Sequence, residues 1–165
     1  MWLRPLPACS STNEAVNQAL IEGAVGGIVA ADCKIGRMTY WAANATVPVY
    51  EISFRIVMTN VSSKPVTLSG DNFATTLDGT PIPPFNFSAR DVGDADIWRT
   101  YDSLTIRPGE ERSIALAYEI SQPTYDSWYK SSRTVAVSFT CGNQRVTYTK
   151  NSRSDEITVS DIETL

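Results

Sequence analysis

Apolar and polar residues alternate along most of the chain after residue 34. In the clearest stretch Tyr50, Ile52, Phe54, Ile56 and Met58 alternate with mostly polar neighbours. This period of two predicts a β-strand with one buried face. The same pattern predicts further short strands at 66–68, 73–77, 85–89, 104–106, 114–120, 135–139, 146–148 and 157–159.

Turn-forming residues separate these segments. The pair Asp78-Gly79 is a strong hairpin signal, because both positions tolerate the positive φ angles of a tight turn. Residues 107–110 read Arg-Pro-Gly-Glu and residues 141–143 read Cys-Gly-Asn, and both predict turns between strands. The prolines in 81–84 exclude a central strand there and indicate a sheet edge or a crossover.

The N-terminal residues follow a different pattern. Ser11 and Glu14 have the spacing of a helix capping box, and apolar residues at helical spacing predict a short helix over about residues 12–22. Residues 24–31 are small and apolar but too few to cross a bilayer, which takes about 20 residues. This arm is expected either to pack on the domain as an extended strand or to dock onto a partner subunit or a lipid surface.

The order of these elements predicts an all-β fold. About seven to nine short strands, with a helix only at the N-terminus, are typical of an antiparallel β-sandwich. We expect an N-terminal segment over residues 1–32, the sandwich over 33–160 and a frayed tail over 161–165.

Several of the strand and turn motifs resemble a known family. They are Thr59-Asn60 at a strand end, the turn and strand of 62–68, Leu77-Asp78-Gly79-Thr80, and the segments 104–110 and 114–118. Together these motifs resemble the telokin-like, immunoglobulin-type domain of secreted bacterial antigens and small lipoproteins. The resemblance covers residues 50–122 and implies an immunoglobulin-like β-sandwich with an extracytoplasmic binding or structural role. It implies no catalytic residues.

Composition and charge exclude several function classes. The 165 residues contain no histidine, which excludes Ser-His-Asp and Cys-His catalysis and every imidazole-ligated metal site. A net charge of −4 with scattered Lys and Arg gives no basic patch for nucleic acid. We therefore expect a non-enzymatic protein with no nucleic-acid partner.

The three cysteines allow more than one interpretation. Cys33 precedes the sandwich strands and Cys141 ends a late one, so the two either form a disulfide between sheets or remain buried free thiols. A disulfide would favour an oxidising compartment. Cys9 follows Leu6-Pro7-Ala8, which is similar to the end of a bacterial lipoprotein signal, but Arg4 and two prolines interrupt the apolar run that such a signal needs. Cys9 is thus either a lipidation site that tethers the chain to a membrane or an ordinary thiol.

An acidic segment is a weak candidate for a metal site. Asp91, Asp94 and Asp96 could offer oxygen ligands to calcium, but the spacing is not that of an EF-hand and the closing glutamate is missing. A solvated acidic loop is the favoured interpretation, so no metal or other cofactor is expected.

Two aromatic clusters are the candidate binding residues. Trp98 with Tyr101, and Tyr125 with Trp128 and Tyr129, lie in polar, loop-like surroundings. Exposed aromatic residues of this kind anchor interfaces, because they bury a large area with few rotatable bonds. The alternative is that they close the ends of the sandwich. Residues 125–130 are the preferred recognition segment.

These observations lead to two functional hypotheses. The first is a binding or structural module of the cell surface or envelope that acts through protein–protein contacts. The alternative is a virion structural or decoration protein docked on a neighbouring subunit through its N-terminal arm. Assembly into a homo-oligomer is compatible with both.

Overall fold

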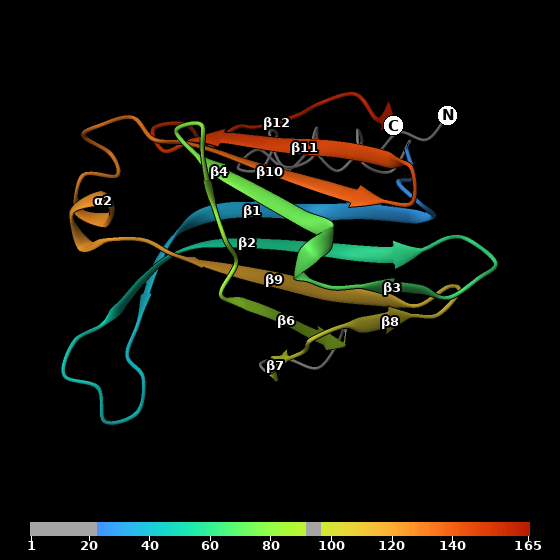
Figure 1. The fold of residues 1–165 in the computed structure, drawn as a ribbon, viewed down its shortest axis with the longest axis horizontal. Coiled ribbons are helices and arrows are strands. Elements are labelled where there is room, and N and C mark those ends of the chain that lie inside the picture. The colour runs from blue at the N-terminus through green and yellow to red at the C-terminus, as the bar shows by residue number, and fades with distance from the viewer. Residues whose placement is uncertain (1–22, 92–96) are drawn as a thin grey trace, which may run out of the picture.

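The protein is an antiparallel β-sandwich in which a five-stranded sheet faces a six-stranded one (Figure 1). The computed structural model describes residues 23–91 and 97–165, so the predicted helix at 12–22, Cys9, Asp94 and Asp96 lie outside the described residues. In the described part the first sheet has the order β1-β2-β9-β6-β7. Its strands are β1 (Ile28–Tyr40), β2 (Val49–Asn60), β9 (Glu111–Glu119), β6 (Asn86–Asp91) and β7 (Arg99–Thr100).

The second sheet has the order β12-β11-β10-β4-β5, and β13 also pairs with β11. Its strands are β12 (Ile157–Val159), β11 (Gln144–Asn151), β10 (Thr134–Cys141), β4 (Phe73–Leu77), β5 (Thr80–Ile82) and β13 (Glu163–Thr164). A separate ribbon pairs β3 (Val66–Leu68) with β8 (Leu104–Ile106), and the short helices are η1 (Gly70–Asn72) and α2 (Gln122–Asp126). The described residues thus form more strands than predicted, because segments as short as β7 and β13 contain too few residues to display an alternating pattern.

The core lies between the two sheets and is built from the alternating residues that the sequence marks. Phe54 of β2 is fully buried, and its ring centroid lies 5.9 Å from that of Phe73 on β4 and 5.7 Å from that of Tyr148 on β11. The Phe73 ring also lies 5.1 Å from the ring of Phe139 on β10. Aromatic pairs at such distances join the facing sheets and stabilise them beyond the area that they bury.

A buried asparagine cross-links three segments at one end of the sandwich. Asn60, the last residue of β2, is 0% exposed. Its side-chain Nδ2 donates to the carbonyl oxygens of Lys64 at 2.8 Å and Ile106 at 2.9 Å. Its Oδ1 accepts from the backbone N–H of Ser62 at 2.9 Å and from the Ser62 hydroxyl at 2.7 Å. The amide therefore holds the β2–β3 turn against β8, with every hydrogen-bonding position used.

The predicted hairpin at Asp78-Gly79 is confirmed. It joins β4 to β5, and both residues have positive φ, 52° for Asp78 and 83° for Gly79. The Asp78 carboxylate also accepts from the Thr134 backbone N–H at 2.8 Å and from the Arg133 guanidinium at 3.0 Å. This hairpin lies at a sheet edge. Pro81 in β5 has no N–H to donate, and at the edge strand this does not interrupt the pairing of central strands.

At both ends the sandwich extends beyond its predicted boundaries, residues 33 and 160. Strand β1 begins at Ile28, earlier than the expected boundary at residue 33, and Val25, Ile28 and Ala30 are buried in the core. Residues 28–31 of the apolar arm are therefore part of a strand packed on the domain. At the other end the tail is not free, because Glu163–Thr164 pairs with β11 and the Glu163 carboxylate accepts from Arg145 at 2.6 Å.

Candidate functional site

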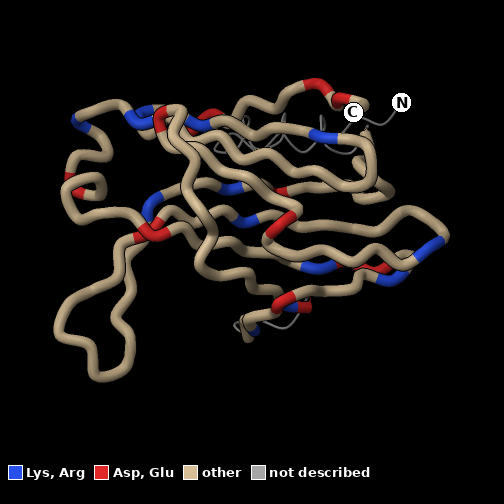
Figure 2. The backbone as a smooth tube through the Cα atoms, viewed as in Figure 1, with Lys and Arg blue, Asp and Glu red and all other residues tan. Residues whose placement is uncertain are grey.

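A projecting hairpin is the most distinctive surface feature of the molecule. Strands β1 and β2 stay paired as far as Tyr40 and Val49, and residues 41–48 form the loop between them. The end of this hairpin extends away from the body of the sandwich (Figure 1). From Met38 to Tyr50 the chain contains no charged residue, and the hairpin loop in Figure 2 is accordingly uncharged throughout.

Large apolar side chains on this loop are open to solvent. Trp41 is 62% exposed, Val47 67% and Tyr40 42%. Exposing large apolar side chains to water is unfavourable. An uncharged, apolar projection is therefore unusual on an isolated soluble domain. The alternating pattern gives no signal for Trp41, since this residue stands alone between two alternating segments. The signal that marks it is the long uncharged run around it.

The second part of the same end is built around α2. Ser121 caps this short helix, its hydroxyl accepting from the Thr124 N–H, and Pro123 occupies the first turn, where its missing N–H costs nothing. The ring of Tyr125 in α2 lies 5.0 Å from the ring of Tyr50 on β2. Helix α2 is thereby held against the base of the hairpin.

An arginine connects α2 to β1. The guanidinium carbon of Arg37 lies 4.3 Å from the ring centroid of Tyr125 and 4.8 Å from that of Tyr129. Its Nη1 also donates to the Tyr125 carbonyl at 2.7 Å. Tyr129 is still 58% exposed, so it is held in place by the stacked cation and yet presents its ring to solvent. We call the set Arg37, Tyr40, Trp41, Val47 and Tyr129 the hairpin end.

The predicted binding residues separate into three groups. Tyr125 and Tyr129 are brought together by Arg37, as described. Trp128, by contrast, is only 2% exposed and belongs to the core, so its assignment as an exposed binding residue is wrong. The turn that follows α2 directs Trp128 inward and its neighbour Tyr129 outward, a difference that the aromatic pattern alone does not reveal.

Trp98 and Tyr101 lie apart from the hairpin end, on either side of β7. Strand β7 is at the margin of the first sheet opposite β1. Both residues are half-buried, and Tyr101 packs against the core. Two cations contact the Trp98 ring, with the guanidinium carbon of Arg55 at 5.4 Å from the ring centroid and that of Arg90 at 5.2 Å. The structure therefore does not join the two predicted aromatic clusters into one site.

The two cysteines in the described part form no disulfide. Cys33 and Cys141 are both buried free thiols, and the Cys141 thiol lies near the Gly26 carbonyl, at 3.8 Å. Burial raises the pKa of both thiols, so both stay protonated and unreactive at neutral pH. Of the two alternatives for Cys33 and Cys141, the structure supports buried free thiols and contradicts a disulfide.

The acidic segment contributes an ion pair. The Asp91 carboxylate forms a salt bridge with the Arg112 guanidinium, with 2.8 Å between Asp91 Oδ1 and Arg112 Nε. Within residues 23–91 and 97–165, no group of His, Cys, Asp or Glu side chains is arranged to hold a metal ion.

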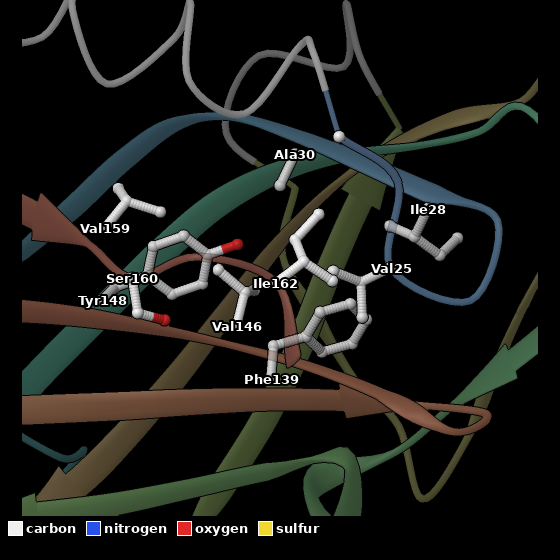
Figure 3. A pocket seen from close by; sticks show the side chains of 10 residues that line it. Val25, Ile28, Ala30, Phe139, Val146, Tyr148, Val159, Ser160 and Ile162 are labelled. Carbon is white, nitrogen blue, oxygen red and sulfur yellow. The ribbon is translucent and has the colours of Figure 1, made fainter. Parts of the chain in front are cut away.

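A small apolar pocket lies where the edge of β1 meets β11 and β12. Val25, Ile28 and Ala30 line it from one side, and Val146 and Tyr148 line it from the second sheet (Figure 3). Its lining offers few polar groups to orient a ligand, and Tyr148 has its pKa raised by burial. Most of the pocket lining belongs to the hydrophobic core.

Among the residues that the structure describes, no helix is long and apolar enough to span a membrane.

Comparisons with known proteins give only distant likenesses. No protein-family model and no curated protein sequence matches the chain. Among solved structures, the yjhA protein from Bacillus subtilis is similar over 69% of this chain and 74% of its own length, with 16% identity and a TM-score of 0.42. An uncharacterized β-sandwich protein from Clostridium difficile 630 is similar over 75% and 83%, with 14% identity and a TM-score of 0.44. These distant structural similarities do not indicate what the chain does.

Proposed function

We propose that the protein is a non-enzymatic binding module that contacts another protein through its hairpin end. The observation that carries this proposal is the projecting, uncharged hairpin with Trp41 and Val47 exposed by 62% and 67%. Tyr129, stacked on Arg37, adds a second aromatic ring at the same end. Trp, Tyr and Arg are the residue types that dominate binding energy at protein interfaces.

The free energy available from burying these side chains is sufficient for specific association. Burying one large apolar side chain contributes about 1.5–3 kcal/mol, and the hairpin end offers Tyr40, Trp41, Val47 and Tyr129. Part of this is lost to the entropy of association, which is smaller when the contact residues are ordered beforehand. The β1–β2 pairing and the Arg37 stack supply that order, so the hairpin end favours binding without refolding.

The wider setting of this module is also a proposal. The family resemblance supports an immunoglobulin-like sandwich with a short N-terminal helix, working at the cell surface or envelope, with residues 1–22 and Cys9 as a tether. Because Cys33 and Cys141 are free thiols, the pair gives no support for an oxidising location. A virion protein docked through its N-terminal segment is the alternative, and the hairpin end would serve either setting as the contact with a neighbouring protein.

Matched alanine variants test the proposal. The full chain carrying a purification tag is expressed in its native source, and the co-purified partner is quantified for wild type, Trp41→Ala and Tyr129→Ala. The control is Val61→Ala, since Val61 is 58% exposed and follows the opposite end of β2. We expect Trp41→Ala to reduce recovery of the partner more than tenfold and Val61→Ala to leave it unchanged. Equal recovery with Trp41→Ala and with Val61→Ala would overturn the proposal.

A further inference from the structure

The last five residues of β1, Gly36 to Tyr40, form an unpaired sheet edge, which we call the hairpin edge. Strand β1 is the first strand of the five-stranded sheet, and in the described part of the chain its partner in the sheet is β2. The hairpin edge leads into the projecting loop (Figure 1), at the end of β1 opposite Ile28, where the strand begins. An exposed edge strand is a template for pairing with another chain.

The hydrogen bonds of β2 determine which backbone groups of the hairpin edge face outward. The Asn60 N–H donates to the Glu110 carbonyl at 3.1 Å, so Asn60 bonds toward the β9 side of β2. Successive residues of a strand bond to opposite sides, so Ser53, seven positions earlier, bonds toward β1. Ser53 is opposite Gly36 in the register of the two strands. Gly36 therefore bonds inward, toward β2.

Arg37 and Thr39 consequently present their backbone groups at the open side of the hairpin edge. They alternate with Gly36 and Met38 along the strand and so bond away from β2. Among the described residues no further strand of the sheet lies on that side of β1. The hairpin edge thus offers two N–H donors and two C=O acceptors to an added strand.

Nothing in the described residues requires glycine at position 36. Gly36 is not among the glycines with positive φ, and a Cβ added to it would meet no atom within 4 Å. Glycine in a strand interior weakens the strand, and it often marks a site where another backbone or a ligand approaches closely. Tyr40, four positions later on the same face of β1, is 42% exposed. The hairpin edge therefore has an unfilled space at Gly36 and an unburied ring at Tyr40.

We infer that the hairpin edge pairs with the hairpin edge of a second copy of this chain, antiparallel about a two-fold axis at Met38. The inference rests on the proposed function, since it names the partner that this end of the molecule contacts. An axis at Arg37 would place the two Arg37 side chains directly opposite each other, and like charges in that position destabilise a strand pair. An axis at Gly36 would set Tyr40 against the bulge between Ala31 and Lys34 of the other copy.

The axis at Met38 satisfies both open features of the hairpin edge. Each Tyr40 ring lies opposite Gly36 of the second copy, and an aromatic ring in that position compensates for the missing side chain of a strand glycine. Each Arg37 lies opposite Thr39 of the second copy, so no two cations face each other. The two Arg37–Thr39 pairs exchange four N–H···O bonds, because each hydrogen-bonded pair exchanges two. The five-stranded sheets of the two copies become one continuous sheet.

Sedimentation velocity of the full chain tests the inference over about 1 μM to 1 mM, a range that covers weak protein interfaces. We expect a monomer–dimer equilibrium. Tyr40→Ala should raise the dissociation constant about tenfold, because the two-fold axis repeats the lost contact in both copies. Val61→Ala is the matched control, since Val61 is 58% exposed and lies beyond the opposite end of β2. It should change the dissociation constant less than about twofold.

Engineered thiols test the register. In Met38→Cys the two new thiols face each other across the axis, with a Cα separation of about 4.5 Å that permits a disulfide. In Lys34→Cys, at an exposed position on the same face of β1, the two thiols lie about 26 Å apart along the paired strands. After air oxidation we expect a disulfide-linked dimer above the wild-type background for Met38→Cys and none for Lys34→Cys.

Two results would overturn the inference. One is a monomer over the whole concentration range, and the other is an equal yield of disulfide from Met38→Cys and Lys34→Cys. If the chain is monomeric and Trp41→Ala still reduces recovery of a partner, the inference fails while the proposed function stands, with a different protein as the partner. Equal recovery of that partner with Trp41→Ala and with Val61→Ala would overturn the proposed function as well.

Discussion

Removal of the Asn60 amide should destabilise the fold far more than its size suggests. In Asn60→Ala four hydrogen bonds disappear: two donated by Nδ2, to Lys64 and Ile106, and two accepted by Oδ1 from Ser62. A typical hydrogen bond contributes about 0.5–1.5 kcal/mol net, and a buried group left without a partner costs more. Since water can replace the partner of the more exposed Ser62 and Lys64 groups, we expect a total loss of about 3–4 kcal/mol.

The measurement is urea and thermal unfolding followed by circular dichroism. For a chain of this length, a loss of about 3–4 kcal/mol lowers the melting temperature by roughly 6–16 °C. Asn143→Ala is the matched control, because Asn143 is exposed in the β10–β11 turn. It should change stability by less than about 0.5 kcal/mol.

A second substitution at the same position separates lost donors from lost volume. Asn60→Asp keeps the shape and the oxygen that accepts from Ser62, but it replaces Nδ2 by a second oxygen, and an ionised carboxylate cannot donate to the carbonyls of Lys64 and Ile106. It should be at least as destabilising as alanine at neutral pH and recover in part as the acid is protonated. A loss below about 1 kcal/mol in both Asn60 variants would refute the role of this amide as the cross-link between the turn and β8.

Three further predictions concern the core, a buried carboxyl and the thiols. Trp128→Ala should cost about 3–5 kcal/mol in urea unfolding, whereas Tyr129→Ala should cost about 1 kcal/mol or less; similar losses would contradict the opposite burial of the two rings. Burial raises the pKa of Glu51 above its ordinary 4.5, an effect that Arg55 partly offsets, so the folded state binds this proton more tightly than the unfolded state and loses stability as the pH rises through that range. Glu51→Gln should therefore unfold at higher urea concentration than wild type at pH 7, with no difference below about pH 4; equal stability at both pH values would count against a buried charge. Cys33 and Cys141 should react with a thiol reagent only after unfolding, as followed by peptide mass mapping, and a Cys33–Cys141 disulfide in the native chain would contradict the buried free thiols.

The strands are the part of the fold that local sequence reveals best. The alternation over residues 50–58 predicts β2 because a strand with one buried face must repeat every second residue. The hairpin at Asp78-Gly79 is equally local, since positive φ is a property of those two residues. Local sequence does not reveal β13, because Glu163–Thr164 becomes a strand only through its pairing with β11.

The candidate sites were harder to predict because they depend on direction and on distant partners. Trp128 and Trp41 are both tryptophans in irregular segments, yet one is 2% and the other 62% exposed. Which of them faces the core depends on where α2 and the hairpin place their backbone. Likewise, Arg99 and Arg112 line one solvent-open hollow only because β6 lies between β7 and β9 in the first sheet.

Site-directed photocrosslinking tests most directly whether the hairpin end is the contact surface. The photoreactive residue p-benzoylphenylalanine is placed at Trp41 in one chain and at Val61 in another, since both side chains are about equally exposed in the isolated protein, 62% and 58%. After irradiation in the native source, we expect one discrete adduct from position 41, whose mass identifies either a second copy or another protein, and none from position 61. Adducts of equal yield at both positions, or none at position 41, would contradict the assignment of the hairpin end as the binding surface.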